Sequence, residues 1–253
     1  MGTLDGRHAL ITGGGKGIGR AAAGALSAAG ATVTVTGRSE DALKEAVAGK
    51  VAAGYFVSDV TDPAALEAGI RDAAGLRGPV DILVANAGAA ETAPFFKTDP
   101  GAFHRLFELN VMGAVHAIRA VMGDMIASGF GRIVAVASTA GLKGYAYTSA
   151  YCVSKHAVVG LVRALAQETA KSGVTINAVC PGFTDTDLVR DSVARITKKT
   201  GRSPADTVAE FVKDAPIGRL IRPDEVAAAI AFLCQAEAGA ITGTTVTVAG
   251  GEI

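Results

Sequence analysis

The sequence predicts an α/β protein in which one parallel sheet carries helices on both faces. Short runs rich in β-branched residues alternate with longer alanine-rich stretches of helical period, which is typical of this architecture. With 253 residues, 49% of them hydrophobic, the chain can bury one large core, so we expect a single domain over residues 1–253. Only residues 183–221 depart from the alternation. We expect this polar, helical insert to form a substrate lid.

Each expected element is a run of one pattern bounded by turn residues. Apolar, β-branched runs predict strands at His8–Thr12, Thr32–Thr36, Tyr55–Val57, Asp81–Ala85, Arg132–Ala137, Val174–Val179 and Thr245–Val248. Runs of helical period predict helices at Gly17–Ala29, Glu40–Ala48, Pro63–Ala74, Pro100–Ala127, Ser149–Lys171 and Pro223–Cys234. Pro63 and Pro223 stand at helix starts, where the missing N–H of proline costs little.

Composition argues against several classes of protein. Lys plus Arg and Asp plus Glu both number 24, so no basic excess is present to bind nucleic acid by counterion release. Residues 1–10 do not resemble a signal peptide, and no later stretch holds the about 18 uninterrupted apolar residues of a membrane span. We expect a cytoplasmic protein that binds neither nucleic acid nor membrane.

Cysteine and histidine spacing predicts no metal site. Cys152, Cys180 and Cys234 form no CxxC pair, and an odd number leaves one cysteine outside any disulfide scheme, which favours reduced thiols. The histidines are scattered along the chain without the spacing of a zinc site, at His8, His104, His116 and His156.

A glycine-rich turn joins the first strand to the first helix. Glycines let the backbone approach a pyrophosphate closely, and the helix N-terminus offers free N–H groups and a partial positive charge. The spacing differs from GxGxxG, and a turn that binds no ligand is the alternative. We predict a dinucleotide site that includes Gly13, Gly15, Lys16, Gly17, Ile18 and Gly19.

Two further segments fall where strand ends meet at the ligand-bearing edge of an open parallel sheet. Asp59-Val60 follows the third strand and Asn86-Ala87-Gly88 follows the fourth, and we predict that all five residues contact the cofactor. In the alternative, Asp59 caps the next helix and Gly88 serves a loop.

The end of the second strand bears on the choice of cofactor. NAD binders usually place an acidic residue there, whereas this chain has Gly37 followed by Arg38. Arginine can bind a 2′-phosphate through paired, charge-assisted hydrogen bonds, and Lys16 supplies a second cation. We therefore favour NADP(H). NAD(H) is the alternative, if Glu40 or Asp41 turns back to the ribose.

Tyr151 and Lys155 form the candidate catalytic pair, because residues four apart in a helix project from one face. A lysine cation about 4 Å from the phenol would favour phenolate by roughly 4 kcal/mol, enough to lower the tyrosine pKa by about 2 to 3 units. Ser138 ends the fifth strand and would bind the substrate oxygen. Asn110, an amide within a helix, would position a water behind Lys155. Taken singly each residue could be structural, so the prediction depends on their joint occurrence.

These residues together resemble the short-chain dehydrogenase/reductase family over essentially the full length. The resemblance rests on the glycine turn, Asn86-Ala87-Gly88, Asn110, Ser138, Tyr151, Lys155 and Pro181-Gly182. It implies a doubly wound Rossmann fold with a seven-stranded parallel sheet, and usually a homotetramer. It implies an oxidoreductase that transfers a hydride between NAD(P)(H) and a ketone or secondary alcohol.

The resemblance also assigns roles to single residues. Ser138 would orient the carbonyl, Tyr151 would exchange the hydroxyl proton, and Asn110 would keep a relay water. Lys155 would lower the pKa of Tyr151 and hold the nicotinamide ribose. The last cofactor contacts would come from the PGxxxT segment, at Pro181, Gly182, Thr184 and Thr186. One departure, Ala85 where the family often has a second asparagine before Ala-Gly, affects a packing contact and not the reaction.

The insert and the C-terminal region bear on the substrate. Residues 187–222 and 241–251 are similar to 3-hydroxybutyrate dehydrogenases and to acetoacetyl-CoA and 3-oxoacyl reductases. This resemblance implies a 3-oxoacyl or 3-hydroxyacyl substrate such as an acyl-CoA. A helical insert would align four cations in one stripe that attracts an anionic substrate tail, at Arg195, Lys198, Lys199 and Arg202. The alternative is a solvated lid face.

Two other functions compete with the oxidoreductase. A sensor or scaffold protein would bind NADP without turnover, but such a protein would be expected to carry a damaged catalytic set, and this set is intact. A sugar epimerase could share the YxxxK pair, but the length and the glycine spacing disfavour it. The helix that begins at Ser149 has a broad apolar surface, explained either by burial between subunits or by complete coverage within one monomer.

Overall fold

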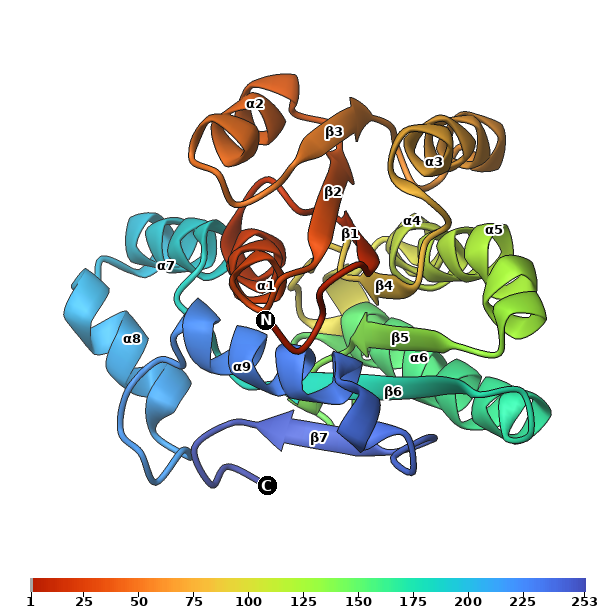
Figure 1. The fold of residues 1–253 in the computed structure, drawn as a ribbon. Coiled ribbons are helices and arrows are strands. Elements are labelled where there is room, and N and C mark those ends of the chain that lie inside the picture. Colours follow the sequence, from red (N-terminus) through yellow and green to blue (C-terminus); the bar gives the residue numbers. More distant parts are fainter. Residues whose placement is uncertain (1) are drawn as a thin grey trace.

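Seven parallel strands form one sheet in the order β3-β2-β1-β4-β5-β6-β7 (Figure 1). The structure, a computed structural model, describes residues 2–253 apart from the side chain of Lys199. The strands are β1 His8–Thr12, β2 Thr32–Gly37, β3 Gly54–Val57, β4 Ile82–Ala85, β5 Gly131–Val136, β6 Val174–Pro181 and β7 Thr245–Val248. The strand order reverses between β1 and β4, the place where open α/β sheets bind ligands.

Nine α-helices, counted over residues 2–253, connect or follow these strands. They are α1 Gly17–Ala28, α2 Glu40–Ala48, α3 Pro63–Arg77, α4 Pro100–Phe107, α5 Gly113–Ser128, α6 Ser149–Thr169, α7 Asp187–Thr200, α8 Pro204–Val212 and α9 Pro223–Cys234. Short helical turns lie at η1 Phe95–Lys97, η2 Glu108–Met112, η3 Thr139–Gly141 and η4 Ala236–Ala238. Most predicted boundaries differ from these by only a few residues.

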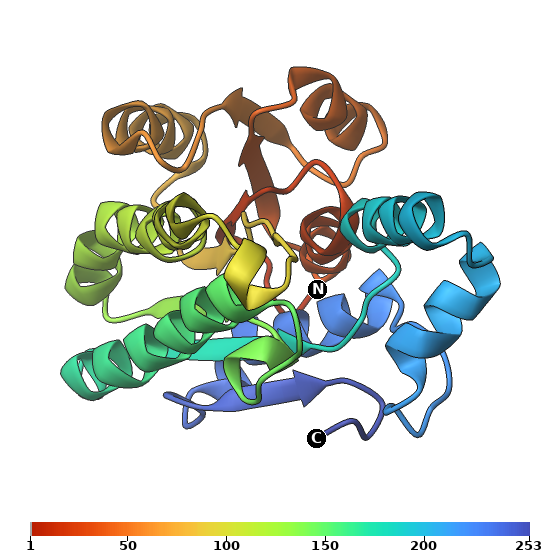
Figure 2. The ribbon, with the colours of Figure 1, turned by 180° about the vertical axis from the view of Figure 1, so that it is seen from behind.

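Two apolar clusters cover the two faces of the sheet. On one face α1, α2 and α9 pack through residues such as Leu26, Leu43 and Ile230. On the other, α3, α5 and α6 pack through residues such as Leu66 and Val162 and stand in front in Figure 2. Every residue of β1, β4, β5 and β6 is buried, which explains why these strands are apolar runs and not alternating patterns. The predicted doubly wound α/β fold is confirmed.

The helix predicted over Pro100–Ala127 spans Pro100–Ser128 but contains a π-helical turn, η2, between α4 and α5. This stretch is also long and apolar enough to cross a membrane, with mean hydropathy 1.2, which the sequence analysis did not anticipate. In the fold, 39% of an apolar 18-residue stretch within Pro100–Ser128 is buried, and Ile118 and Val121 of α5 belong to the core. Core helices of soluble proteins share this length and composition.

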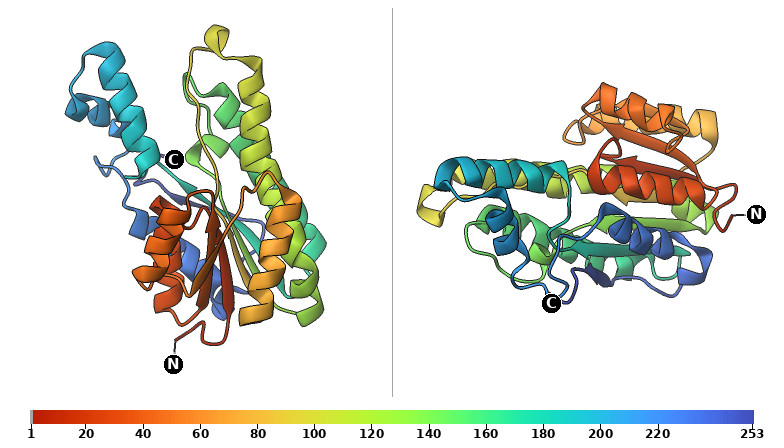
Figure 3. Two further views of the ribbon diagram at one scale, coloured as in Figure 1. Left: turned by 90° about the horizontal axis from the view of Figure 1, so that it is seen from above. Right: turned by 90° about the vertical axis from the view of Figure 1, so that its left-hand side faces the viewer.

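The insert after β6 contains α7 and α8, as the predicted helical lid requires. Both helices and α4 extend beyond the same end of the sheet (Figure 3, left). Of the predicted cationic stripe, Arg195, Lys198 and Arg202 are exposed, while the side chain of Lys199 lies outside the described part of the structure.

Candidate active site

The glycine turn between β1 and α1 has a backbone that side chains would disrupt. Gly13 and Gly17 have φ of +65° and +52°, in the left-handed region that favours glycine. A Cβ at Gly19 would overlap the carbonyl oxygen of Gly13 and come within 2.5 Å of Asn86 Nδ2. The turn is therefore packed tightly against the end of β4.

Helix α1 begins without a side-chain cap. Its N-cap residue is Lys16, whose side chain accepts no hydrogen bond, whereas Asp62 caps α3 and Asp99 caps α4. The first N–H groups of α1 therefore have no side-chain partner, and they bear the positive end of the helix dipole. A pyrophosphate fits these donors, so the residues present suit a dinucleotide.

Thr12, a residue that the sequence analysis did not single out, joins the glycine turn to Asn86-Ala87-Gly88. Its hydroxyl accepts hydrogen bonds from the backbone N–H groups of Asn86 (3.0 Å) and Ala87 (3.1 Å). Asn86 Nδ2 donates to the carbonyl oxygens of Thr12 (3.0 Å) and Gly13 (3.2 Å). The pairing of β1 with β4 brings these segments together. In the sequence, the only feature that could have indicated this role of Thr12 was its position at the end of the first strand.

The segment after β6 reaches the same turn. Thr186 lies beside Gly17, with its Cγ2 3.2 Å from the position of a Cβ there. Thr184 is only 4% exposed, and its hydroxyl donates to the carbonyl oxygen of Gly182 at 3.0 Å. Thr186 is thus placed beside the dinucleotide turn, next to Pro181-Gly182 at the end of β6, while the hydroxyl of Thr184 is occupied by the backbone.

Arg38 and Asp59 meet at the ends of β2 and β3. Arg38 Nη1 lies 3.9 Å from Asp59 Oδ2, and the other carboxylate oxygen accepts from the N–H (3.0 Å) and hydroxyl (2.8 Å) of Thr61. These hydrogen bonds, with a smaller effect of Arg38, hold the pKa of Asp59 below its ordinary value. The alternative in which Asp59 caps α3 is wrong, because Asp62 accepts from Ala65 N.

The neighbouring positions at this edge are engaged elsewhere. Glu40, one of the two residues considered as an NAD ribose ligand, pairs with Lys44 at 3.0 Å and accepts a hydrogen bond from Tyr55. The carbonyl oxygen of Val60 is 3.0 Å from His116 Nδ1. Arg38, with 74% of its side chain exposed, is accessible to a ligand.

Tyr151 and Lys155 project from one face of α6, as their spacing predicts. Lys155 Nζ lies 5.7 Å from the centroid of the Tyr151 ring and donates to the carbonyl oxygen of Val136 at 2.8 Å. The side chain of Ser138, which follows β5, lies beside the Tyr151 hydroxyl, and its Oγ accepts from Ala140 N at 3.1 Å. Phenol, ammonium and serine hydroxyl thus come together at the carboxyl end of β5.

The predicted effect of Lys155 on the tyrosine is wrong for this arrangement. Burial raises the pKa of Tyr151 to about 12, and the hydrogen bond with Ser138 only partly opposes it. Burial also lowers the pKa of Lys155 to about 8. The prediction assumed an ammonium about 4 Å from the phenol and neglected desolvation of both groups, which favours their neutral forms.

Asn110 lies in the π-helical turn η2 and is 3% exposed. Its Oδ1 accepts from Ala89 N (2.9 Å), and its Nδ2 donates to Ala89 O and to Ser154 Oγ, both at 3.0 Å. A Cβ on Gly88 would lie 2.8 Å from Asn110 Oδ1 and 3.6 Å from Lys155 Nζ. The asparagine therefore ties the loop after β4 to α6. Ser154, its partner, was not foreseen.

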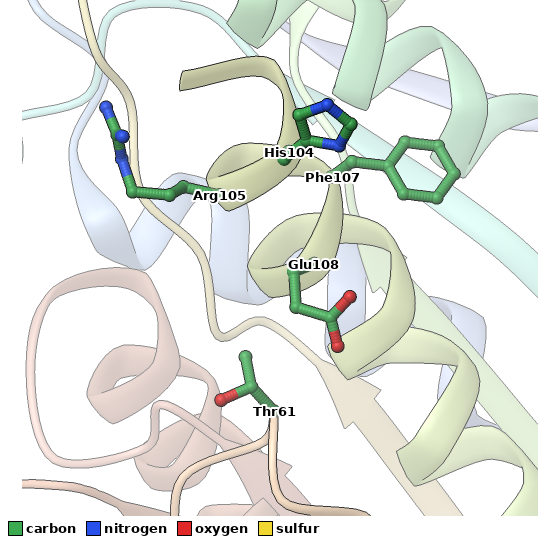
Figure 4. Close-up of a pocket in the computed structure, with 5 residues that line it drawn as sticks. All are labelled: Thr61, His104, Arg105, Phe107 and Glu108. Carbon is green, nitrogen blue, oxygen red and sulfur yellow. The ribbon is translucent and has the colours of Figure 1, made fainter. Parts of the chain in front are cut away.

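An open hollow of about 510 Å³ lies between α4, η2 and the segment that follows β3 (Figure 4). It is lined by Thr61, His104, Arg105, Phe107 and Glu108, and none of the predicted site residues borders it. Arg105 points away from Phe107 in Figure 4 and pairs with Glu91 and Asp99. Among residues 2–253, no three His, Cys, Asp or Glu side chains come together as a candidate metal site.

Comparisons with known proteins match nearly the whole chain. Residues 7–196 match the family model described as short chain dehydrogenase. The chain is 35% identical to an acetoacetyl-CoA reductase of Shinella zoogloeoides, covering 97% of this chain and 98% of the relative. It is 36% identical to a D-beta-hydroxybutyrate dehydrogenase of Cupriavidus necator, covering 99% of both. A solved variant of actinorhodin polyketide ketoreductase with NADPH has a TM-score of 0.93 and 33% identity, covering 100% of this chain and 99% of that one.

Proposed function

The chain belongs to the short-chain dehydrogenase family, and on this premise we propose that it is an NADP(H)-dependent oxidoreductase that interconverts a ketone and a secondary alcohol. The observation that carries the proposal is the grouping of Tyr151, Lys155 and Ser138 at the sheet edge that also bears the uncapped N-terminus of α1. One edge then holds both a proton donor and a dinucleotide cradle, by which we mean the glycine turn between β1 and α1 and the N-terminus of α1.

The side chains have separate tasks in the proposed reduction. Bound NADPH supplies the hydride that the carbonyl carbon gains. Ser138 donates a hydrogen bond to the carbonyl oxygen, and Tyr151 transfers its phenolic proton to that oxygen, which yields a secondary alcohol and a phenolate. A proton from solvent then restores the phenol. With its pKa near 12, Tyr151 is protonated at neutral pH, the form that a proton donor requires.

Lys155 and Asn110 hold this arrangement. At neutral pH Lys155 is mostly an ammonium, because its pKa of about 8 lies above 7. Its proposed partners are the carbonyl oxygen of Val136, which it already contacts, and the nicotinamide ribose. Asn110 fixes the loop after β4 through both its amide atoms, and the proposed relay water would lie between it and Lys155.

Arg38 and Lys16 favour NADP(H) over NAD(H). Both cations stand at strand and helix ends beside the dinucleotide cradle, and an arginine can bind a 2′-phosphate with two hydrogen bonds. The similar ketoreductase structure contains NADPH, which agrees with this choice.

We propose a 3-oxoacyl or 3-hydroxyacyl substrate, such as an acyl-CoA. The named relatives act on acetoacetyl-CoA and on D-β-hydroxybutyrate, which share a 3-oxygenated four-carbon acyl group. The exposed Arg195, Lys198 and Arg202 on the lid would attract the anionic tail of a thioester.

The proposed assembly is a cytoplasmic homotetramer. On α6, Val153 is 53% exposed while Leu161 and Leu165 are partly buried within the monomer. The monomer therefore covers most of the broad apolar surface of α6, and Val153 and the exposed Phe107 of α4 are the side chains that a second copy would cover. Gel filtration with light scattering tests this assembly.

The decisive experiment measures NADPH oxidation with acetoacetyl-CoA and a panel of ketones, for the native chain and Tyr151→Phe. Loss of the proton donor should lower kcat about 10³-fold while the Kd of NADPH stays within about threefold. Tyr147→Phe is the matched control, because it removes an exposed phenol four residues earlier. Tight NADPH binding without turnover of any ketone by the native chain would instead favour the sensor.

A further inference from the structure

The proposed reaction leaves one buried carboxylate unused. Glu252, the second-to-last residue, has only 4% of its side chain exposed. It accepts a hydrogen bond from the Tyr145 hydroxyl, and its Oε1 lies 3.1 Å from the Nζ of Lys143. A buried charge requires such partners, and both come from the loop between β5 and α6.

This carboxylate lies beside the loop that presents Ser138. The hydroxyl of Tyr145 is 2.6 Å from Thr139 Oγ1, and Thr139 directly follows Ser138. One hydrogen-bonding group, the Tyr145 hydroxyl, therefore separates the side-chain carboxylate of Glu252 from Thr139, the residue next to the proposed carbonyl ligand.

Aromatic contacts extend the same surface to the lid. The ring of Tyr145 meets Phe183 edge to face with centroids 6.0 Å apart, and Phe183 stacks on Phe211 of α8 at 4.7 Å. All three rings are partly buried, so each keeps an accessible surface. We call Lys143, Tyr145, Phe183, Phe211 and Glu252 the tail wall.

The C-terminal tail also holds the base of the lid. Ile217, between α8 and α9, donates its N–H to the carbonyl oxygen of Gly250 at 3.1 Å. Glu252 and Gly250 thus connect the loop of Ser138 with the insert that carries Phe211. The C-terminal tail therefore holds both the β5–α6 loop, which carries Lys143 and Tyr145, and the base of the insert that carries Phe211.

Charge on the tail wall is balanced. Lys143 is 32% exposed and would attract an anionic group, but Glu252 neutralises it at 3.1 Å. Arg219 is a further cation that lines the same small cavity as Glu252. Its guanidinium is bound by both carboxylate oxygens of Glu225 at 2.8 and 2.7 Å. A substrate carboxylate therefore meets no uncompensated cation at this wall.

We propose that Glu252 determines substrate specificity by cancelling the charge of Lys143 beside the Ser138 loop. The site then favours 3-oxo substrates whose C1 group is uncharged, an ester or thioester, over the free 3-oxo carboxylate. This inference rests on the proposed function and selects between the chemistries of the two named relatives, a thioester reductase and a hydroxy-acid dehydrogenase.

The test compares acetoacetate with its ethyl ester, which share one 3-oxo skeleton and differ in charge. For the native chain we expect kcat/KM to be at least about tenfold higher for the ester. Glu252→Gln retains an acceptor for Tyr145 but frees the ammonium of Lys143, so the preference for the ester should fall about tenfold. Lys143→Met leaves the carboxylate uncompensated and should increase the preference for the ester.

The opposite signs of the two variants separate an effect of charge from damage to the fold, because misfolding would lower both activities without reversing the ratio. The double variant with Glu252→Gln and Lys143→Met should return to the native ratio of kcat/KM for the ester over acetoacetate. A native preference for acetoacetate, or an unchanged ratio in Glu252→Gln, overturns the proposal.

A binding measurement keeps the inference independent of turnover. Calorimetric titration of acetoacetate and its ester into Tyr151→Phe with NADP⁺ should give the same order of affinities and the same shifts in the Glu252 and Lys143 variants. Failure of the proposed function shows as absent turnover by the native chain. Failure of the inference shows as equal or reversed affinities in the titration.

Discussion

The two halves of the candidate site are built by opposite means. The dinucleotide half is made of backbone. Gly13 and Gly19 leave no room for side chains, Gly17 has a φ in the left-handed region, and α1 leaves its N–H groups uncapped. The catalytic half is made of buried side chains. The side-chain polar atoms of Asn110 and Lys155 are hydrogen-bonded to other atoms of the protein. Adding one methyl group to the dinucleotide half should therefore disrupt cofactor binding. Removing one side chain from the catalytic half should disrupt turnover.

The strongest test of this contrast is Gly19→Ala. The new Cβ would overlap the Gly13 carbonyl oxygen, so the turn must shift and the cradle loses its shape. We expect the affinity for NADPH to fall about a hundredfold and the free energy of unfolding to fall by about 1 to 3 kcal/mol. Fluorescence titration of NADPH and urea unfolding measure these two effects.

Gly24→Ala is the matched control on the same helix. A Cβ there meets only Val51 Cγ1 at 3.6 Å, an ordinary contact. Alanine should stabilise α1 by about 0.5 to 1 kcal/mol and leave NADPH binding unchanged. Equal loss of NADPH binding in both variants would show that the cradle does not depend on the backbone at Gly19.

Lys155→Met tests the catalytic half, with opposite effects on stability and activity. Burial lowers the lysine pKa from 10.5 to about 8, so the folded chain holds this charge at a cost of roughly 3 kcal/mol at neutral pH. The hydrogen bond to Val136 offsets about 1 to 2 kcal/mol of it. Methionine should therefore raise the free energy of unfolding by about 1 to 2 kcal/mol at pH 7 and abolish turnover.

The sign of the pH dependence makes this prediction specific. Between pH 8 and 10 the unfolded chain binds more protons at Lys155 than the folded chain, so native stability rises with pH. The advantage of Lys155→Met should shrink over this range in urea unfolding. Lys171→Met, at an exposed position after α6, should change stability by less than about 0.5 kcal/mol at any pH.

The smallest expected effect is that of Arg38→Ser. The side chain is 74% exposed and near Asp59, so solvent and that carboxylate weaken its attraction for a 2′-phosphate. We expect the ratio of NADPH to NADH affinity to fall about tenfold. Arg71→Ser on α3, another exposed arginine, should leave the ratio unchanged. An unaltered ratio of NADPH to NADH affinity in Arg38→Ser would contradict this role of Arg38. It would favour the alternative in which Glu40 or Asp41 contacts the ribose.

Features that depend on neighbours in sequence were predictable, and features that depend on distant partners were not. The strands could be read because burial on both faces makes them apolar runs, and the spacing of Tyr151 and Lys155 was sufficient to place them on one face. The π-helical turn contains Asn110, whose side chain bonds to residues 21 and 44 positions away in the sequence. The pKa of Tyr151 depends on how deeply the fold buries it, which residue spacing does not encode.

The π-helical turn at Glu108–Met112 puts α4 and α5 out of phase by one residue. An α-helix advances about 100° per residue, so deleting one residue from this turn would rotate α4 by that angle relative to α5. Ala102 and Leu106, which now pack against Ala150 of α6, would turn away from it. The chain length between Pro100 and Gly113 is therefore as much a determinant of the catalytic geometry as the identity of Asn110. Natural insertions and deletions should be far less tolerated here than in the surrounding loops.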